Sequence, residues 1–290
     1  MDLHTLHTKF KTEQDCHNFL QSIRWSNGAE CTFCNSKKVY KRKTSYRLKC
    51  RNCNKSFSVT SGTIFHSSRI PLMKWFLAIV VISNAKKGIS SLQLARTINV
   101  NKNTSWYLQH RLRKAMKEDY LLKGLIEVDE TYIGGKLGNM SYAYKQKRNP
   151  HKSGMVHMSP VLGILQRNGK IILKALDHAN GQNIKPLLYN CINPESKVIT
   201  DGFGGYFGIG KTFERHIKLN HEKRQMKWGR YHLSNIEGFF STIKRAVIGQ
   251  YHIISKFHIQ NYMDEIAFKK NHSPNEIFYL LLSNCLTRCR

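Results

Sequence analysis

The stretch LIEVDETYIGG, residues 125–135, decides how the second half of the chain is interpreted. Apolar and polar side chains alternate from Leu125 to Tyr132, which is typical of a β-strand with one buried face. Asp129 lies within this strand, in a chain that has 18 acidic residues against 47 lysines and arginines. A carboxylate placed in such a strand is a candidate for chemistry, and the segments around it indicate the fold.

Further strands and helices follow this strand. Residues 161–166 and 170–176 have the pattern of a hairpin around Asn168 and Gly169, and residues 197–200 form another short apolar run. Helical periodicity predicts helices over residues 183–192 and 236–247. Strands that come first and then alternate with helices predict an α/β fold, a mixed sheet flanked by helices.

The composition limits the classes of function. A formal net charge of +29 on 290 residues predicts an anionic partner, whereas 41% hydrophobic and 11% aromatic residues exclude a disordered chain. The longest apolar run, residues 75–82, is far shorter than the roughly 18 residues of a membrane span, so we expect no membrane partner. Residues 1–16 contain no apolar stretch typical of a signal peptide, so we expect a cytoplasmic protein.

Two Cys-x2-Cys pairs, Cys31 with Cys34 and Cys50 with Cys53, are separated by fifteen residues. This is zinc-ribbon spacing, in which two tight turns bring four thiolates to one ion. Because a reducing compartment is expected, we predict that these four cysteines bind one structural Zn²⁺. The remaining cysteines lack such spacing and are expected to be ordinary reduced residues: Cys16, Cys191, Cys285 and Cys289.

Residues 88–117 have the outline of a helix-turn-helix. Ser90 or Ser91 can cap a first helix that ends at Ile98, residues 99–103 form a turn, and a second helix covers about 104–116. A helix pair of this kind is also a common structural unit, but the basic side chains of its second helix favour a DNA-binding role. We expect a polar stripe on that helix to contact DNA, formed by Gln109, Arg113 and Lys117.

Residues 134–157 are rich in glycine and basic side chains and show no clear periodicity, so they are expected to form a basic loop. Lys145 and Lys147 lie in this loop. We expect them to contact DNA phosphates, independently of base sequence.

Three carboxylates are spaced so that they can converge at one edge of the sheet. Asp201 ends the strand in VITDGFGGY, and Glu237, separated from it by 35 residues, opens the helix NIEGFFSTIKR. Lys244 follows Glu237 by two helical turns and projects from the same face. With Asp129, these carboxylates could hold two hard divalent cations, Mg²⁺ or Mn²⁺, and the lysine could meet a phosphate as a point charge.

The segments EVDETYIGGK, TDGFGGY and SNIEGFFSTIKRAVIGQYHIISKFHIQNYMDEIAFKKN resemble the bacterial insertion-sequence transposases of the ISXO type. The resemblance covers roughly residues 15–272, and the last segment is its most specific part. That family joins a zinc ribbon and a helix-turn-helix to an RNase H-like domain with a DDE triad. By this resemblance Asp129, Asp201 and Glu237 match the triad, and Lys244 matches the basic residue that follows it.

The sequence departs from the family pattern at two positions. Lys269 stands where an arginine is common, and Phe240 stands where a tryptophan is common. Relatives can carry an asparagine as the third metal ligand, so Asn235 competes with Glu237. Glu127 shares a strand face with Asp129. It either supports the metal site or lies at the surface, and we expect it to lie at the surface.

The resemblance implies a DNA transposase that recognises transposon ends, cleaves the 3′ ends and transfers them into target DNA. Its partner would be DNA, bound by at least a homodimer. We keep two alternatives, a catalytically silent DNA-binding regulator and a nuclease without strand transfer. The expected domains are an N-terminal helical segment at 1–25, a zinc ribbon at 26–62, a helix-turn-helix at 70–119, an RNase H-like domain at 124–272 and a C-terminal tail at 273–290.

Overall fold

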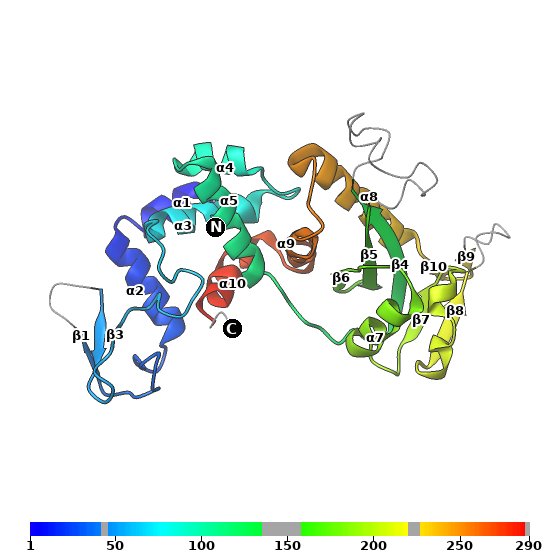
Figure 1. Ribbon diagram of the computed structural model, residues 1–290, viewed down its shortest axis with the longest axis horizontal. Helices are drawn as coiled ribbons and strands as arrows, with labels where there is room; N and C mark the ends of the chain where they lie inside the picture. Colours follow the sequence, from blue (N-terminus) through cyan, green and yellow to red (C-terminus); the bar gives the residue numbers. More distant parts are fainter. Residues whose placement is uncertain (42–45, 135–157, 220–226, 288–290) are drawn as a thin grey trace, which may run out of the picture. The chain divides into compact units, whose positions relative to one another are not determined.

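Strand β4, Leu125–Ile133, is the central strand of a five-stranded sheet in the computed structural model, which describes residues 1–41, 46–134, 158–219 and 227–287 (Figure 1). Antiparallel pairing joins it to β5, Ser159–Gln166, and joins β5 to β6, Ile171–Ala175. Parallel pairing joins it to β7, Lys197–Thr200, and joins β7 to β8, Arg215–Lys218. The order β6-β5-β4-β7-β8 confirms the predicted mixed sheet.

Helices cover both faces of this sheet. Ile126 and Val128 of β4 pack in a core with α7, Gly181–Cys191. The other face packs against α8, Ser234–Ala246, and α9, Ile259–Asn271. A short hairpin of β9, Lys227–Trp228, and β10, Tyr231–His232, precedes α8. Because side chains alternate along a strand, Glu127 and Asp129 lie on the α8 face, opposite to Ile126 and Val128.

The edge strand β6 is protected by two amide side chains of α9. Gln260 donates to the carbonyl oxygen of Leu173 over 3.0 Å and accepts from the backbone N–H of Ala175 over 2.7 Å. Asn271 forms the same pair of bonds with the backbone of Ile171, at 2.9 and 2.8 Å. These bonds satisfy backbone groups that an uncovered edge would offer to another chain.

The chain divides into two units, Met1–Met116 with His272–Arg290, and Lys117–Asn271. In the first unit the helices pack around α3, Leu72–Asn84, which is apolar on most of its circumference. Phe76 of α3 makes edge-to-face contacts with Phe10 and Phe278, with ring centroids 4.9 and 6.1 Å apart. The helices that contact α3 are α1, Leu3–Lys9, α2, Glu13–Arg24, α4, Ser91–Ile98, and α10, Pro274–Leu286.

Helix α10 lies in residues 273–290, which are predicted to form a C-terminal tail. Ser273 and Glu276 form a capping box at its start, and Phe278, Leu281 and Leu282 are buried. The capping box satisfies the first backbone donors, and burial of the apolar side chains holds the helix against α3. The structure therefore places this segment inside the first unit.

The zinc-ribbon and helix-turn-helix regions also lie in the first unit. Three short antiparallel strands form the ribbon: β1, Val39–Lys41, β2, Leu48–Cys50, and β3, Ser56–Phe57. Ser90 caps α4, and Asn99 ends it in the left-handed conformation. Asn101 caps α5, Lys102–Ala115, so this helix begins two residues earlier than predicted. Among the described residues no helix is long and apolar enough to cross a membrane.

Candidate catalytic and nucleic-acid-binding sites

The four predicted zinc ligands lie together in the ribbon. The Sγ atoms of Cys31 and Cys53 are 3.6 Å apart, as are those of Cys34 and Cys50, and all four lie within 4.8 Å of one another. Four thiolates about 2.3 Å from a tetrahedral zinc ion are about 3.8 Å apart from each other, so the observed cluster fits Zn²⁺. Backbone N–H groups, first that of Cys53, lower the pKa of the Cys50 thiol. The backbone N–H of Ser36 lowers the pKa of the Cys34 thiol, but burial and hydrogen bonds to the other three cysteines outweigh this effect, so that this pKa is raised instead.

Two of the three side chains of the predicted polar stripe, those of Gln109 and Arg113 on α5, are not at the surface. Ser105, Gln109 and Arg113 are at most 2% exposed, and the side chains of Arg113 and Gln109 bond to each other over 2.8 Å. The helix thus turns this stripe, together with Leu108 and Leu112, toward the interior of its unit. The expectation that Gln109 and Arg113 face DNA is wrong for this structure. Spacing alone did not distinguish the two faces, because α5 carries polar side chains on both.

The exposed face of α5 carries other side chains. Lys102, Asn103, Tyr107 and Lys114 are exposed, and Tyr107 is 65% accessible. Lys117 is also exposed, but it lies beyond the end of α5, where it pairs with Asp119 over 3.9 Å. Lys145 and Lys147 of the predicted basic loop lie outside the described residues.

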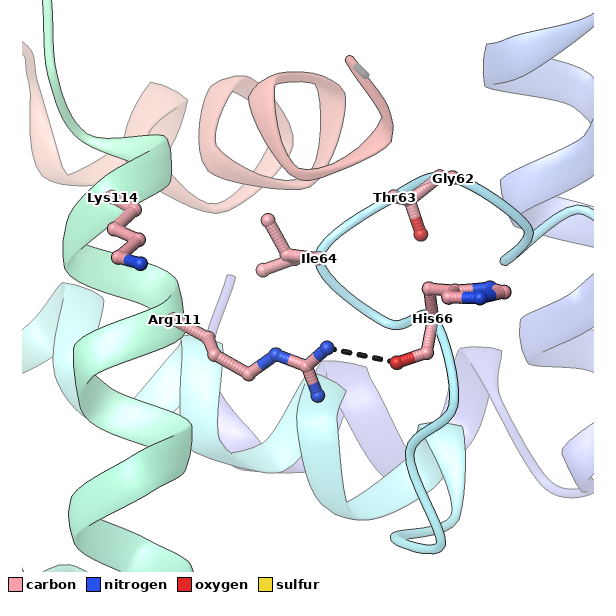
Figure 2. Close-up of a pocket in the computed structure, with 6 residues that line it drawn as sticks. All are labelled: Gly62, Thr63, Ile64, His66, Arg111 and Lys114. Carbon is pink, nitrogen blue, oxygen red and sulfur yellow. Dashed lines mark hydrogen bonds between the residues drawn. The ribbon is translucent and has the colours of Figure 1, made fainter. Parts of the chain in front are cut away.

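A basic pocket of about 310 Å³ lies beside the same helix, within the first unit (Figure 2). The guanidinium group of Arg111 donates to the carbonyl oxygen of His66 over 2.8 Å, and Lys114 lies one turn further along α5. A pocket lined by these cationic groups suits a phosphate. Its lining residues are Gly62, Thr63, Ile64, His66, Arg111 and Lys114.

The candidate catalytic centre begins with Asp129 on β4. Its Oδ1 accepts the backbone N–H of Glu130 over 2.8 Å. Burial first, then the charge of Glu130 and further those of Asp201 and Glu237, raise the pKa of Asp129 to about 7. The carboxylates of Asp201 and Glu237 therefore act on Asp129, although they come from separate segments of the chain.

Asp201 follows β7, which runs parallel to β4, so both strands bring their acids toward the same edge. The Oδ1 of Asp201 accepts the backbone N–H of Phe203 over 3.0 Å, which holds the carboxylate in the turn after the strand. Glu237 is exposed in the first turn of α8, and Lys244 is exposed in its last turn. Asp177, by contrast, pairs with Lys256 over 3.2 Å at the surface.

Glu130, next to Asp129 on β4, is a further acid near the centre and has no predicted role. It faces away from Asp129 and accepts a hydrogen bond from the buried hydroxyl of Tyr206. Burial, together with the charge of Asp201, raises the pKa of Glu130, although the bond from Tyr206 opposes this shift. The adjacent EVDE pattern signals an extra acid at this strand, but only the tertiary structure shows its partner.

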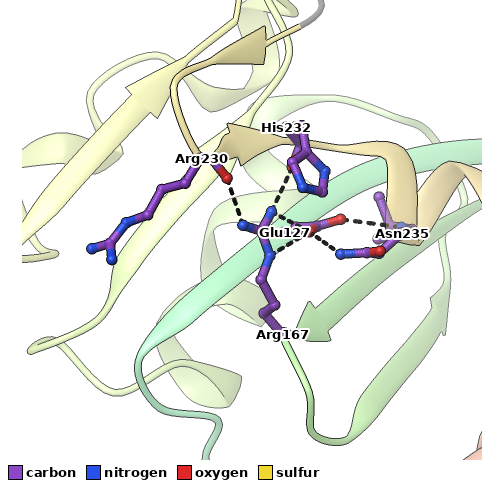
Figure 3. Close-up of polar contacts among 6 residues, drawn as sticks. Glu127, Arg167, Arg230, His232 and Asn235 are labelled. Atoms are coloured by element: carbon purple, nitrogen blue, oxygen red, sulfur yellow. Dashed lines mark hydrogen bonds and ion pairs between the residues drawn. The ribbon is translucent and has the colours of Figure 1, made fainter.

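Glu127 is expected at the surface, but this expectation is wrong, because its side chain is 0% exposed. Figure 3 shows its polar contacts. Arg167 contacts its Oε1 through Nε at 3.0 Å and Nη2 at 2.6 Å, and Asn235 donates to the same oxygen over 2.8 Å. The other oxygen, Oε2, accepts the backbone N–H of Ile236 over 3.1 Å. These four bonds offset the cost of burying the charge.

The spacing of the carboxylates can be compared with the spacing that two divalent cations need. Within the described residues the four-cysteine cluster is the one group of three or more possible ligands whose atoms all lie within 4.8 Å. Two metal ions about 4 Å apart are held by ligands up to about 8 Å apart, so a two-metal site does not need such tight clustering. The hard oxygen donors and the raised pKa of Asp129 fit a site that a cation would stabilise.

Comparisons with known proteins agree with this arrangement. A family model described as the ISXO2-like transposase domain matches residues 121–271, just over half of the chain. A second, described as a transposase zinc-ribbon domain, matches residues 11–56. A relative from Halobacterium salinarum, named as an uncharacterized protein in transposable element ISH50, is 27% identical over 249 residues, which cover 81% of this chain and 83% of the relative. The two matched regions include the four cysteines and the three carboxylates.

Proposed function

The chain belongs to the family of ISXO2-like transposases, and from this premise we propose that it cleaves the 3′ ends of an insertion sequence and joins them to target DNA. One observation carries the proposal. The charges of Asp201 and Glu237 contribute to raising the pKa of the half-buried Asp129, so acids from β4, from the end of β7 and from α8 share one region. Crowded carboxylates of this kind are typical of sites that hold cations.

In this proposal Asp129, Asp201 and Glu237 hold two Mg²⁺ or Mn²⁺ ions. When bound, such ions activate the attacking oxygen and stabilise the leaving oxygen at phosphorus. Lys244, two turns after Glu237 on the same helix, binds a DNA phosphate and orients the strand. The same residues serve both reactions, in which water attacks first and the freed 3′ hydroxyl attacks second.

The first unit recognises the transposon ends. The exposed side chains of α5, such as Asn103 and Tyr107, replace Gln109 and Arg113 as the candidates for contact with bases. The pocket beside Arg111 and Lys114 suits a backbone phosphate, which would fix the protein on the duplex without reading its sequence. Because two ends must be joined together, a homodimer or a higher oligomer on DNA is part of the proposal.

The basic loop contributes to affinity rather than specificity. The double variant Lys145→Ala with Lys147→Ala weakens binding to end-containing and random duplexes by the same factor. Each lost phosphate contact also reduces the slope of log affinity against log salt by about 1. A loss confined to the end sequence would instead assign base recognition to the loop.

The decisive experiment uses a duplex that carries candidate end sequences, incubated with the protein and Mg²⁺ or Mn²⁺. Cleaved and joined products support the transposase, and Asp201→Asn serves as the inactive control. Cleavage without joining supports the nuclease, and DNA binding without cleavage supports the regulator. Short inverted repeats that flank the reading frame would supply the end sequences for this test.

A further inference from the structure

We propose that Glu127 is a positioning residue of the catalytic centre, which fixes the start of α8 and thereby the place of Glu237 relative to Asp129. The inference rests on the proposed function, because it takes Asp129 and Glu237 as metal ligands. Glu127 itself is fully buried on β4 and does not bind metal in this proposal.

Helix α8 has no side-chain cap of its own at its N-terminus. Leu233 stands at the N-cap position and offers no side-chain hydrogen bond. Ile236 is the third residue of the helix, and its N–H belongs to the first turn, where backbone donors have no partner within the helix. The Oε2 of Glu127 accepts this N–H over 3.1 Å. A strand residue thus performs the role that a serine or aspartate normally performs at the helix start.

Arg167 links the strand to the hairpin that leads into α8 (Figure 3). Arg167 contacts Glu127 twice and also donates to the carbonyl oxygens of Arg230 and His232, at 2.6 and 3.0 Å. The guanidinium group therefore joins the strand to the segment immediately before the helix. A planar group with five donors can make all these bonds at once, whereas a lysine cannot.

An independent contact brings α8 onto the sheet at the same level. Gly163 of β5 pairs with Asp129 of β4. A Cβ atom at Gly163 would lie 2.8 Å from the ring of Phe240 and 2.9 Å from the side chain of Ile236. Any larger residue would push α8 away from the strand that carries Asp129. The close approach and the Glu127 contacts act together on the first two turns of α8.

These contacts give Asn235 a role other than that of a metal ligand. Its Nδ2 donates to Glu127 over 2.8 Å. Asn235 is therefore the third group that bonds to this carboxylate, beside Arg167 and the backbone N–H of Ile236. Glu127 and Asp129 are two residues apart, about 7 Å along one strand face, and Glu237 follows Ile236 directly. The strand that supplies the first acid therefore also sets the position of the third.

The test measures Mn²⁺ binding directly, as the loss of the free-ion electron paramagnetic resonance signal, on the zinc-loaded full chain. Glu127→Gln keeps the side-chain shape but removes the charge that pairs with Arg167. We expect it to weaken Mn²⁺ binding at least about tenfold, as the loss of groups that orient metal ligands typically does. End cleavage in the same variant should require a correspondingly higher Mn²⁺ concentration and recover in part at saturation, while DNA affinity stays unchanged.

The matched control is Glu265→Gln. Glu265 also forms a buried ion pair in the second unit, with Lys269 at 2.6 Å, but on α9. We expect Glu265→Gln to lower the melting temperature and to leave Mn²⁺ binding unchanged. If both variants lose Mn²⁺ affinity equally, general destabilisation explains the effect and the inference is wrong. If Glu127→Gln does not fold, Arg167→Lys replaces it under the same criterion.

The outcomes separate this inference from the proposed function. Asp129→Asn and Glu237→Gln should each abolish Mn²⁺ binding, and if neither does, the proposed metal site fails. If both abolish it while folded Glu127→Gln binds Mn²⁺ like the wild type, the metal site stands and the positioning role of Glu127 is overturned.

Discussion

In helix α5, Arg113 donates from Nη2 to the Oε1 of Gln109 over 2.8 Å, and both side chains are only 2% exposed. The pair lies one helical turn apart on the face that packs into the first unit. A buried charged group that is hydrogen-bonded stabilises a core only while its partners remain, so this pair belongs to the structure of the unit rather than to its surface.

Replacing Arg113 with alanine should therefore destabilise the protein. We expect Arg113→Ala to reduce the free energy of unfolding by about 1 to 3 kcal/mol, because it leaves the buried Gln109 amide without this partner. Thermal melts monitored by circular dichroism measure the loss. Lys114→Ala, at the next and exposed position, is the control and should melt like the wild type. An unchanged melting temperature for Arg113→Ala would contradict the buried arrangement.

Specific DNA recognition should depend on the exposed face of α5. We expect Asn103→Ala or Tyr107→Ala to weaken binding to end-containing duplexes by about 1 to 3 kcal/mol if these side chains reach bases. Binding to a random duplex of equal length should change little, and fluorescence anisotropy at one fixed salt concentration compares the two. Equal losses on both duplexes would show that this face contacts the backbone only.

The four-cysteine cluster should hold one zinc ion per chain. We expect Cys50→Ser together with Cys53→Ser to abolish zinc binding in native mass spectrometry, because two ligands of a closed four-sulfur shell are lost. Removal of the metal by a chelator should unfold the ribbon and expose Phe57, which is buried there. Cys191→Ser, in the second unit, is the control and should retain zinc; a wild-type protein without zinc would refute the prediction.

Glu237 should be the third acid of the catalytic centre. We expect Glu237→Gln to abolish metal-dependent cleavage and joining while DNA affinity stays near that of the wild type, because only a ligand charge is removed. Asn235→Ala should reduce the activity less, since it removes only one of the hydrogen bonds to Glu127. Glu214→Gln, a surface acid paired with Lys197, is the control. Full activity of Glu237→Gln with loss in Asn235→Ala would make the asparagine the ligand.

Asp264 should make stability depend on pH. Burial raises the pKa of this α9 carboxyl, although a hydrogen bond from Gln260 opposes the shift. The charged carboxylate is thus disfavoured in the folded state and lowers the free energy of unfolding. This destabilisation is fully present above the raised pKa and disappears as the pH falls through 3.8, the ordinary pKa of an aspartate. Asp264→Asn should be more resistant to urea than the wild type at pH 8, and this advantage should shrink on acidification. The exposed Asp177→Asn should show no such trend.

The sequence by itself determined the features that depend on local spacing. Two Cys-x2-Cys turns identify the zinc ligands because each turn brings its own pair together, and the structure gathers all four. Period-two and helical patterns predict the strands and helices of the mixed sheet, and Ser90, one of the two predicted caps, begins the first helix of the helix-turn-helix. Such signals depend on neighbours in the chain, so they survive without knowledge of the fold.

Only the tertiary structure decided which polar side chains are buried. Arg113 and Gln109 face inward because the other elements of the first unit pack on that side of α5, and no local pattern records this. Glu127 is buried because Arg167, 40 residues away, and the start of α8, 109 residues away, converge on its carboxylate. A buried charge is tolerated only where such distant partners meet it, and their meeting is a property of the folded chain rather than of any segment.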